Sequence, residues 1–132
     1  MATFHRFEDL EIWQTARKLS LKVFKLTEAG PFSKDFKCRD QIRSSAGSVM
    51  DNIAEGFDRG GKLEFINFLS YSKGSTGEVK SQLYRAKDVR YISIERFDEL
   101  YLQYDKLAGQ IAGFISYLNK ILIKGQKFKD RL

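Results

Sequence analysis

Residues 56–63 of the chain read GFDRGGKL, and this stretch decides between two folds. A glycine, four residues, then Gly61 and Lys62 match a phosphate-binding loop, which would indicate a nucleotide-hydrolysing enzyme. Such a loop also needs a strand before it, a helix after it, and Ser or Thr directly after the lysine. Leu63 occupies that last position. The stretch is therefore predicted to be a turn between two helices.

The residues before this turn follow the spacing of an amphipathic helix. Ile42, Ala46, Val49 and Ile53 recur every three or four residues, which places them on one helix face. A helix here leaves no strand to present a phosphate-binding loop, so a helical hairpin is favoured. The helix after the turn is predicted to carry on its inner face Phe65, Leu69, Ser72, Thr76, Val79, Leu83 and Ala86.

Two more helices are predicted, one on each side of this hairpin. The first covers residues 7–27 and ends before Gly30 and Pro31, a pair that stops helices, with a loop around PFSKDF at 31–36. Its apolar stripe contains Ile12, Ala16, Leu19, Val23 and Leu26, widened by Trp13, Ser20 and Phe24. The last helix has Ser93 as its predicted N-cap. Its inner face carries Phe97, Leu100, Tyr104, Leu107, Ile111, Ile115, Leu118 and Leu122.

Four amphipathic helices joined by short links predict an all-α fold, an antiparallel up-down-up-down four-helix bundle. The chain has 132 residues, 42% of them hydrophobic, which suffices for one compact domain with a buried core. We assign residues 1–123 to this domain. Residues 124–132 form a basic C-terminal tail that we expect to be flexible.

The net charge of +6 favours an anionic partner, with nucleic acid first. Residues 120–132, KILIKGQKFKDRL, hold five basic residues and one acidic residue, so +4 of the +6 lies there. A basic tail is equally typical of a solubilising chain end, and the tail alone does not decide between the two. A second basic patch, on the first helix, contains Arg17, Lys18, Lys22 and Lys25.

Cysteine content and hydropathy indicate the cellular compartment of the protein. The single cysteine, Cys38, excludes an intrachain disulfide and fits a reducing compartment. The start, MATFHRFEDLEIWQ, lacks the basic segment and uninterrupted apolar run of a secretory signal. No apolar run approaches the roughly 18 residues of a membrane span. We therefore expect a soluble, cytoplasmic protein that does not cross a membrane.

Residues that support catalysis are scarce. His5 is the only histidine, which excludes the usual histidine-based nucleophile relays and the paired Glu-x-x-His motifs of a di-metal bundle. Lys37 and Arg39 are basic neighbours that could lower the pKa of Cys38. Without a base or an oxyanion cradle, however, Cys38 is interpreted as a helix-start residue. We predict a non-enzymatic protein with no metal and no cofactor.

Small residues occur in both helices of the hairpin, as SSAGS at residues 44–48 and SKGSTG at residues 72–77. The second segment has the Gly-x-x-Gly spacing of a KH-domain clamp, but that clamp needs a sheet. Glycine inside a helix costs about 1 kcal/mol. Gly47, Gly74 and Gly77 therefore predict a compensating close approach of the two helices.

A stripe of hydrogen-bonding groups, here called the polar seam, runs beside the apolar faces of the hairpin. An antiparallel hairpin that turns near residue 60 places Gln41 near Glu78 and Ser45 near Ser75. Three interpretations are open: a solvated surface, a structural network within or between subunits, or a surface for a ligand or nucleic acid. The polar seam comprises Gln41, Ser45, Ser48, Asn52 and Glu55 on one helix and Tyr71, Ser75, Glu78, Gln82 and Arg85 on the next.

Three long segments carry a resemblance to a known family. FEDLEIWQTARKL (7–19), QIRSSAGSVMDNIAEGFDR (41–59) and EFINFLSYSKGSTGEVKSQL (64–83) resemble the four-helix-bundle proteins encoded in intervening sequences of bacterial 23S ribosomal RNA genes. The resemblance implies an up-and-down bundle in a family with ring-like pentameric members. That family also resembles the accessory variability proteins of diversity-generating retroelements, which are basic pentamers that bind nucleic acid and a reverse transcriptase.

The sequence therefore favours a homo-oligomeric bundle, by resemblance a pentamer, that binds RNA or DNA through basic surfaces; a reverse transcriptase is a further possible partner. A protein-interaction scaffold with no direct nucleic-acid role is the alternative, in which the polar seam and the aromatic residues form subunit contacts. Aromatic residues that could stack on bases are Tyr71, Tyr84 and Tyr91. Candidate phosphate contacts are Arg39, Arg43, Arg59, Lys62, Arg85, Lys124 and Lys127.

Overall fold

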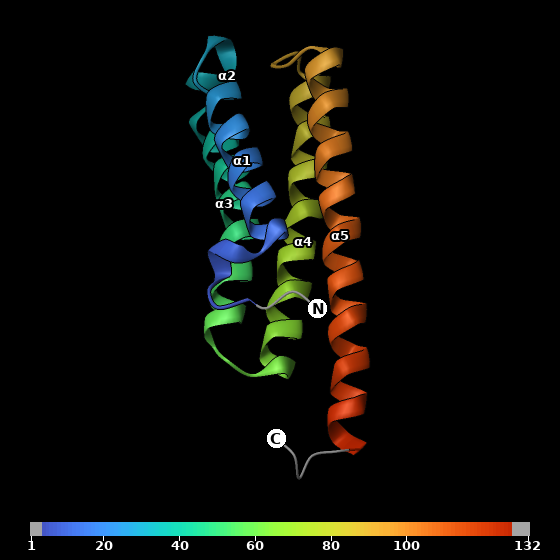
Figure 1. Cartoon of the computed structure of the whole chain (residues 1–132). Helices are drawn as coiled ribbons and strands as arrows, with labels where there is room; N and C mark the ends of the chain where they lie inside the picture. The colour runs from blue at the N-terminus through green and yellow to red at the C-terminus, as the bar shows by residue number, and fades with distance from the viewer. Residues whose placement is uncertain (1–3, 128–132) are drawn as a thin grey trace.

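The computed structural model describes the backbone of residues 4–127 and the side chains of residues 4–121. All regular structure in this part of the chain is helical, and the four long helices run side by side in alternating directions (Figure 1). This confirms the predicted all-α antiparallel bundle. Its elements are the 3-10 turn η1 (Phe7–Asp9) and the helices α1 (Glu11–Leu26), α2 (Gly30–Lys34), α3 (Phe36–Asp58), α4 (Lys62–Asp88) and α5 (Ile94–Lys127).

The core lies between the four long helices, where the predicted apolar faces meet. α3 packs along α4, α4 along α5, and α1 against both α3 and α5. Every residue predicted for the inner face of α4 is buried, Ser72 and Thr76 included. On α5 the buried face includes Tyr104 and Leu107. The three- and four-residue spacing therefore identified most of the core, although Phe24 is exposed and Ile115 half-buried, and the side chain of Leu122 lies outside the described residues.

The start of the bundle differs from the prediction of one helix over residues 7–27. Residues 7–9 form η1, Leu10 is extended and fully buried, and α1 begins only at Glu11. The break turns the chain so that Leu10 enters the core, and Phe7 packs edge-on against Trp13 with ring centroids 5.0 Å apart.

The predicted loop at residues 31–36 contains the short helix α2. Gly30 ends the preceding turn with a left-handed φ of +62°, which favours glycine. Pro31 then fits the first turn of a helix, where its missing N–H is not needed. The buried Phe32 ring fastens α2 to the bundle.

The other helix boundaries follow local chemistry. Gly60, with φ +84°, makes the turn between α3 and α4, and Ser93 accepts a hydrogen bond from the Arg96 amide at 3.1 Å, which confirms it as the N-cap of α5. Because α5 continues through Lys127, the predicted domain boundary at residue 123 falls inside a helix. Residues 128–132 of the predicted tail lie outside the described residues.

The prediction that Gly47, Gly74 and Gly77 allow close packing of α3 on α4 is wrong. A Cβ atom added at any of them would meet nothing within 4 Å, because they face away from the neighbouring helices. The close approach occurs instead at Gly56, where a Cβ would lie 2.5 Å from the Cβ of Phe68. Spacing alone could not show which glycines face the partner helix.

Candidate nucleic-acid interface

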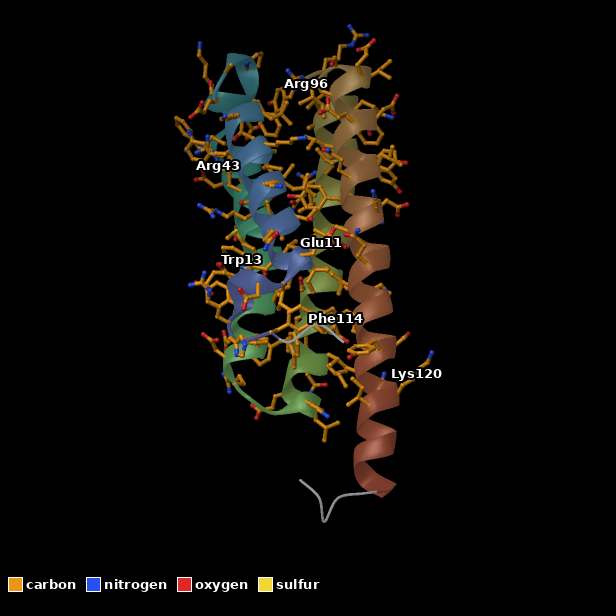
Figure 2. The ribbon with its side chains drawn as sticks, in the orientation of Figure 1. Glu11, Trp13, Arg43, Arg96, Phe114 and Lys120 are labelled. Atoms are coloured by element: carbon orange, nitrogen blue, oxygen red, sulfur yellow. The ribbon has the colours of Figure 1, made fainter. Side chains whose placement is uncertain are left out.

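A surface groove of about 1000 Å³ runs along α1 and reaches α3. Both cationic and aromatic side chains line it, and Figure 2 shows Trp13 and Arg43 on this side of the bundle. We call this surface the α1 groove, and its lining includes Arg6, Trp13, Arg17, Lys18, Leu21, Phe24 and Met50.

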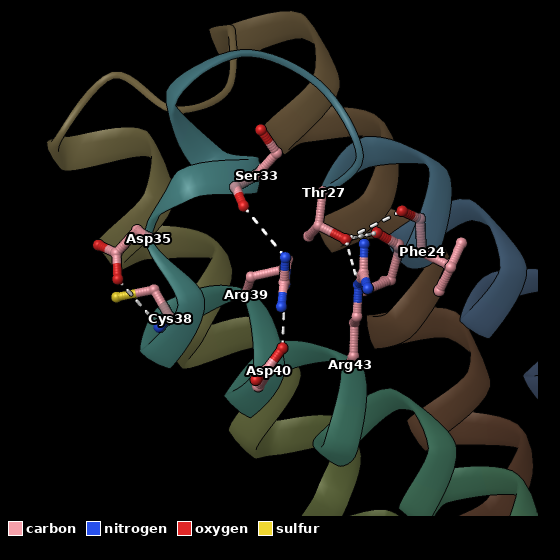
Figure 3. Close-up of polar contacts among 9 residues, drawn as sticks. Phe24, Thr27, Ser33, Asp35, Cys38, Arg39, Asp40 and Arg43 are labelled. Atoms are coloured by element: carbon pink, nitrogen blue, oxygen red, sulfur yellow. Dashed lines mark hydrogen bonds and ion pairs between the residues drawn. The ribbon is translucent and has the colours of Figure 1, made fainter.

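Two arginines lie over aromatic rings at this surface. The Arg17 guanidinium is 5.7 Å from the centroid of the Trp13 ring, and that of Arg43 is 4.0 Å from the centroid of the Phe24 ring. Arg43 also donates from Nε to Thr27 Oγ1 at 2.7 Å (Figure 3). Thr27 is buried and donates in turn to carbonyls of the last turn of α1. The α1–α3 contact therefore holds Arg43 beside the α1 groove.

Sequence reasoning missed the aromatic part of this groove. Trp13 and Phe24 were predicted to widen the core stripe of the first helix. Trp13 does so, since it is half-buried against the core, whereas Phe24 is 44% exposed and the neighbouring Leu21 is 54% exposed. The interleaving of these residues with Arg17 and Lys18 at helical spacing was the available signal. Of the predicted basic patch on this helix, Lys22 is engaged elsewhere, since its Nζ lies 3.7 Å from Glu99 on α5.

The predicted phosphate contacts lie in several places. Arg39 is near the α1–α2 end of the bundle, where it donates to the Ser33 carbonyl at 3.1 Å and to Asp40 at 3.0 Å (Figure 3). Arg43 adjoins the α1 groove. Arg85 is on α4, with its Nη1 3.4 Å from Gln41 Oε1.

Arg59 and Lys62 lie at the opposite end of α3, beside the turn. Sixteen residues of helix separate Arg43 from Arg59, about 24 Å along the axis. Arg59 is paired with Glu55 at 2.8 Å and Glu64 at 3.7 Å, and the hydrogen bond to Glu55 raises its pKa. Lys62 is exposed at the start of α4. The side chains of Lys124 and Lys127 lie outside the described residues.

The middle of the polar seam is a hydrogen-bonded network between α3 and α4. Ser75 Oγ donates to Ser48 Oγ at 3.0 Å, and Asn52 Nδ2 reaches the same oxygen at 2.9 Å. Ser72 adds a bond of 2.7 Å to the carbonyl of Val49. In this part of the seam the polar groups join the two helices.

The predicted register at the ends of the polar seam is wrong by more than a turn. Gln41 meets Arg85, whereas Glu78 is exposed. Helical side chains tilt toward the N-terminus of their own helix. In an antiparallel pair, a residue of α3 therefore meets one of α4 that lies farther from the turn. Glu55 accepts a hydrogen bond from Arg59, four residues farther along the chain.

Cys38 lies at the start of α3, where Asp35 caps the helix by accepting from the Cys38 amide at 3.2 Å (Figure 3). The expectation that basic neighbours lower its pKa is wrong. Burial of the thiol, together with the adjacent Asp35 carboxylate, raises the pKa of Cys38 and leaves it a weak nucleophile.

The described residues contain no group of three or more His, Cys, Asp or Glu side chains arranged to hold a metal ion. Over the same part of the chain, none of the helices combines the length and apolar character needed to span a bilayer.

A family model for 23S rRNA-intervening sequence proteins matches residues 8–113. The chain belongs to this family. The match covers the whole polar seam and, apart from Arg6, the residues named for the α1 groove, so nearly all of both lies within the part that defines a 23S rRNA-intervening sequence protein. No curated protein sequence matches the chain.

A solved structure shares the fold of this 23S rRNA-intervening sequence protein. It is the crystal structure of a protein of unknown function from the S23 ribosomal protein family of Bacteroides thetaiotaomicron. The two superpose with a TM-score of 0.74 at 18% sequence identity, over 80% of this chain and 95% of that one. At this identity the match shows a common architecture and nothing about a shared ligand.

Proposed function

We propose that this protein is a non-enzymatic, homo-oligomeric bundle that binds RNA, or another nucleic acid, through its basic surfaces. The α1 groove is the observation that carries this proposal. It combines exposed cationic side chains, which neutralise phosphates, with the exposed ring of Phe24 and the half-buried ring of Trp13, on which unpaired bases stack. Single-stranded RNA is the best matched substrate, because a duplex hides the faces of its bases.

The positions of Trp13 and Phe24 support this assignment. Each ring has an arginine over or beside one face, so a stacked base would place its phosphate near a cation. Stacking on an aromatic side chain contributes about 1–3 kcal/mol per base. Both rings lie on α1, so successive nucleotides of one strand would follow that helix.

Assembly would multiply a modest surface charge. A single α1 groove offers few cations, whereas several copies in one particle bind a long strand with a high effective concentration. We therefore include a homo-oligomer in the proposal, with a pentamer favoured by the family resemblance. A particle mass near five times 15.3 kDa, measured by light scattering behind a sizing column, tests that number.

Fluorescence anisotropy with single-stranded RNA, structured RNA and duplex DNA across a salt series tests the binding. The double variant Arg17→Gln/Lys18→Gln removes two cations from the α1 groove. Its matched control is Lys73→Gln/Lys120→Gln, which removes the same charge from exposed sites that do not line the groove.

The groove variant should lower the salt slope for single-stranded RNA by about 1.4, the share of two phosphate contacts. The control should leave the slope nearly unchanged. Equal losses in both variants would mean diffuse charge attraction and would contradict a groove. Absence of binding near physiological salt would sink the nucleic-acid function itself.

A protein-interaction scaffold is the second candidate, and the outer face of α4 and α5 favours it. Gly74 and Gly77 on α4 and Gly109 on α5 are exposed inside helices, and each costs about 1 kcal/mol without an internal contact. A helix of another chain could approach this face closely. Loss of assembly in Gly74→Ala, with RNA binding absent from the start, would favour the scaffold.

A further inference from the structure

A small cavity of about 100 Å³ lies where the start of α3 meets the end of α4. Phe32 of α2 and Ala86 of α4, both almost fully buried, supply apolar wall. Tyr91 closes another side, with its ring centroid 5.2 Å from that of Phe32. An apolar cavity of about 150 Å³ holds a benzene molecule. This cavity has about two thirds of that volume and is open on one side, so a single six-membered ring would enter it with one edge at the mouth.

The polar wall of the cavity contains an unsatisfied group. Gln82 Oε1 is shielded from solvent and has no hydrogen-bond partner among the described residues. A buried acceptor left unpaired costs about 1–3 kcal/mol. Gln41 and Arg85 line the same cavity, and the 3.4 Å contact between them is long for a hydrogen bond. The three side chains are therefore available for a ligand.

The cavity has two charged groups of opposite sign in its wall, Asp35 and Arg85, so a neutral ligand is favoured inside. Asp35 lines it, accepting a 2.7 Å hydrogen bond from the Tyr91 hydroxyl. That bond holds the pKa of Asp35 below its usual value, so the carboxylate is charged at neutral pH. A neutral ring is favoured inside. A phosphate attached to that ring would stay outside, near the exposed guanidinium of Arg85.

We propose that this cavity receives one unpaired pyrimidine base, with uracil the best matched. The proposal deepens the RNA-binding function and rests on it for its biological meaning. The N3–H of uracil supplies the donor that Gln82 Oε1 lacks, while the Gln82 amide donates to one adjacent carbonyl and Arg85 to the other. A purine, with two fused rings, exceeds the cavity.

Free nucleosides carry no phosphate and so lack the phosphate contacts of the α1 groove, and a reporter inside the cavity separates binding there from stacking in the groove. Uridine, cytidine, adenosine and N-methylacetamide are titrated into the ¹⁵N-labelled full chain, and the side-chain amide of Gln82 is followed by NMR. Uridine should shift this signal saturably, with half-saturation at least tenfold below that of adenosine. Because Gln82→Leu removes that reporter, the side-chain amide of Gln41, which lines the same cavity, is followed in the variants. Gln82→Leu should abolish the response of Gln41 to uridine, whereas Gln110→Leu, which alters an amide outside the cavity, should retain it.

A lack of saturation by uridine up to tens of millimolar would overturn the proposal. Equal responses to N-methylacetamide and uridine would overturn it in favour of a peptide amide from a protein partner. If Gln82→Leu misfolds by circular dichroism, Arg85→Ala replaces it, since that side chain is exposed. It should weaken uridine binding several-fold.

The two functions fail in different ways. Uridine binding without any RNA binding would support the cavity proposal and contradict the proposal that the α1 groove binds RNA. RNA binding with no uridine response and no preference for oligo-U over oligo-A would contradict only the proposal that the cavity receives a base.

Discussion

The hydroxyl of Ser75 on α4 donates a 3.0 Å hydrogen bond to the hydroxyl of Ser48 on α3, at the centre of the polar seam. Ser75 is buried and Ser48 half-buried, so water cannot readily replace either hydroxyl as the hydrogen-bond partner of the other. The Asn52 amide fixes Ser48 from one turn farther along α3. This bond therefore contributes to the register of the hairpin, because a slip of either helix would leave a buried hydroxyl unpaired.

Replacing Ser75 by Ala should destabilise the protein by about 1 kcal/mol. A double-mutant cycle with Ser48→Ala, measured by urea unfolding, should give a coupling of about 0.5–1 kcal/mol. Glu78→Ala is the control, since that side chain is exposed on the same helix and should change stability little. Additive effects of the two serine substitutions would show that the bond contributes nothing.

Two glycine substitutions should act in opposite directions. Gly56→Ala places a Cβ 2.5 Å from the Cβ of Phe68, which cannot rotate away, and should cost about 1–3 kcal/mol. Gly74→Ala meets open space in an exposed helix and should stabilise the subunit by about 0.5–1 kcal/mol. Thermal unfolding measures both. A destabilised Gly74→Ala would mean that the α4–α5 face is covered by another chain.

Tyr104 places a hydroxyl in the core with no hydrogen-bond partner among the described residues. Tyr104→Phe removes that unpaired group and should be neutral or stabilising by about 1 kcal/mol at pH 7. Tyr71→Phe, at a 59% exposed site, is the matched control and should have little effect. A loss of more than 1 kcal/mol in Tyr104→Phe would show that the hydroxyl does have a partner.

The same residue predicts a loss of stability in alkali. Burial raises the pKa of Tyr104 well above 10.0, whereas in the unfolded chain it ionises near that value. As the pH rises, the unfolded state therefore loses the Tyr104 proton before the folded state does. The contribution of Tyr104 to stability falls as the pH rises above 10. Between pH 9 and 11, the melting temperature of Tyr104→Phe should fall less than that of the wild type. Parallel curves would contradict this.

Asp35 should contribute stability that is lost in acid. The Tyr91 hydroxyl, then the Cys38 amide, lower the pKa of Asp35 from 3.8, so the folded state favours the carboxylate. Its contribution is complete above about pH 3.8 and declines as the pH falls through the lowered value. Asp35→Asn should flatten the dependence of the melting temperature between pH 5 and 2. Asp51→Asn, which replaces an exposed carboxylate, is the control and should leave the dependence of the melting temperature on pH as it is in the wild type.

Periodicity was enough to predict the helices and most of the core. Three- and four-residue spacing places Ile42 and Leu83 on inner faces, and both are fully buried. It works because an α-helix fixes the direction of each side chain relative to its neighbours. The short helix α2 was missed, since five residues give no period and Gly30-Pro31 can both end one helix and begin another.

The contacts around the candidate site were predicted less well, because they depend on how separate helices are set against each other. The sequence shows the arginines and the polar stripes, but it does not show that Arg43 lies over Phe24 of another helix. It also places Gln41 beside Glu78, when the tilt of the side chains brings it to Arg85.

The sequence by itself determined a helical bundle with a basic surface, because helix period and net charge are local or additive properties. Only the tertiary structure decided which glycine touches a neighbour, which aromatic rings stay exposed beside cations, and that Gln82 presents an unpaired oxygen to a cavity. These features depend on the axial offset and rotation of packed helices. Both are set by the summed fit of many side chains, which no single stretch of sequence encodes.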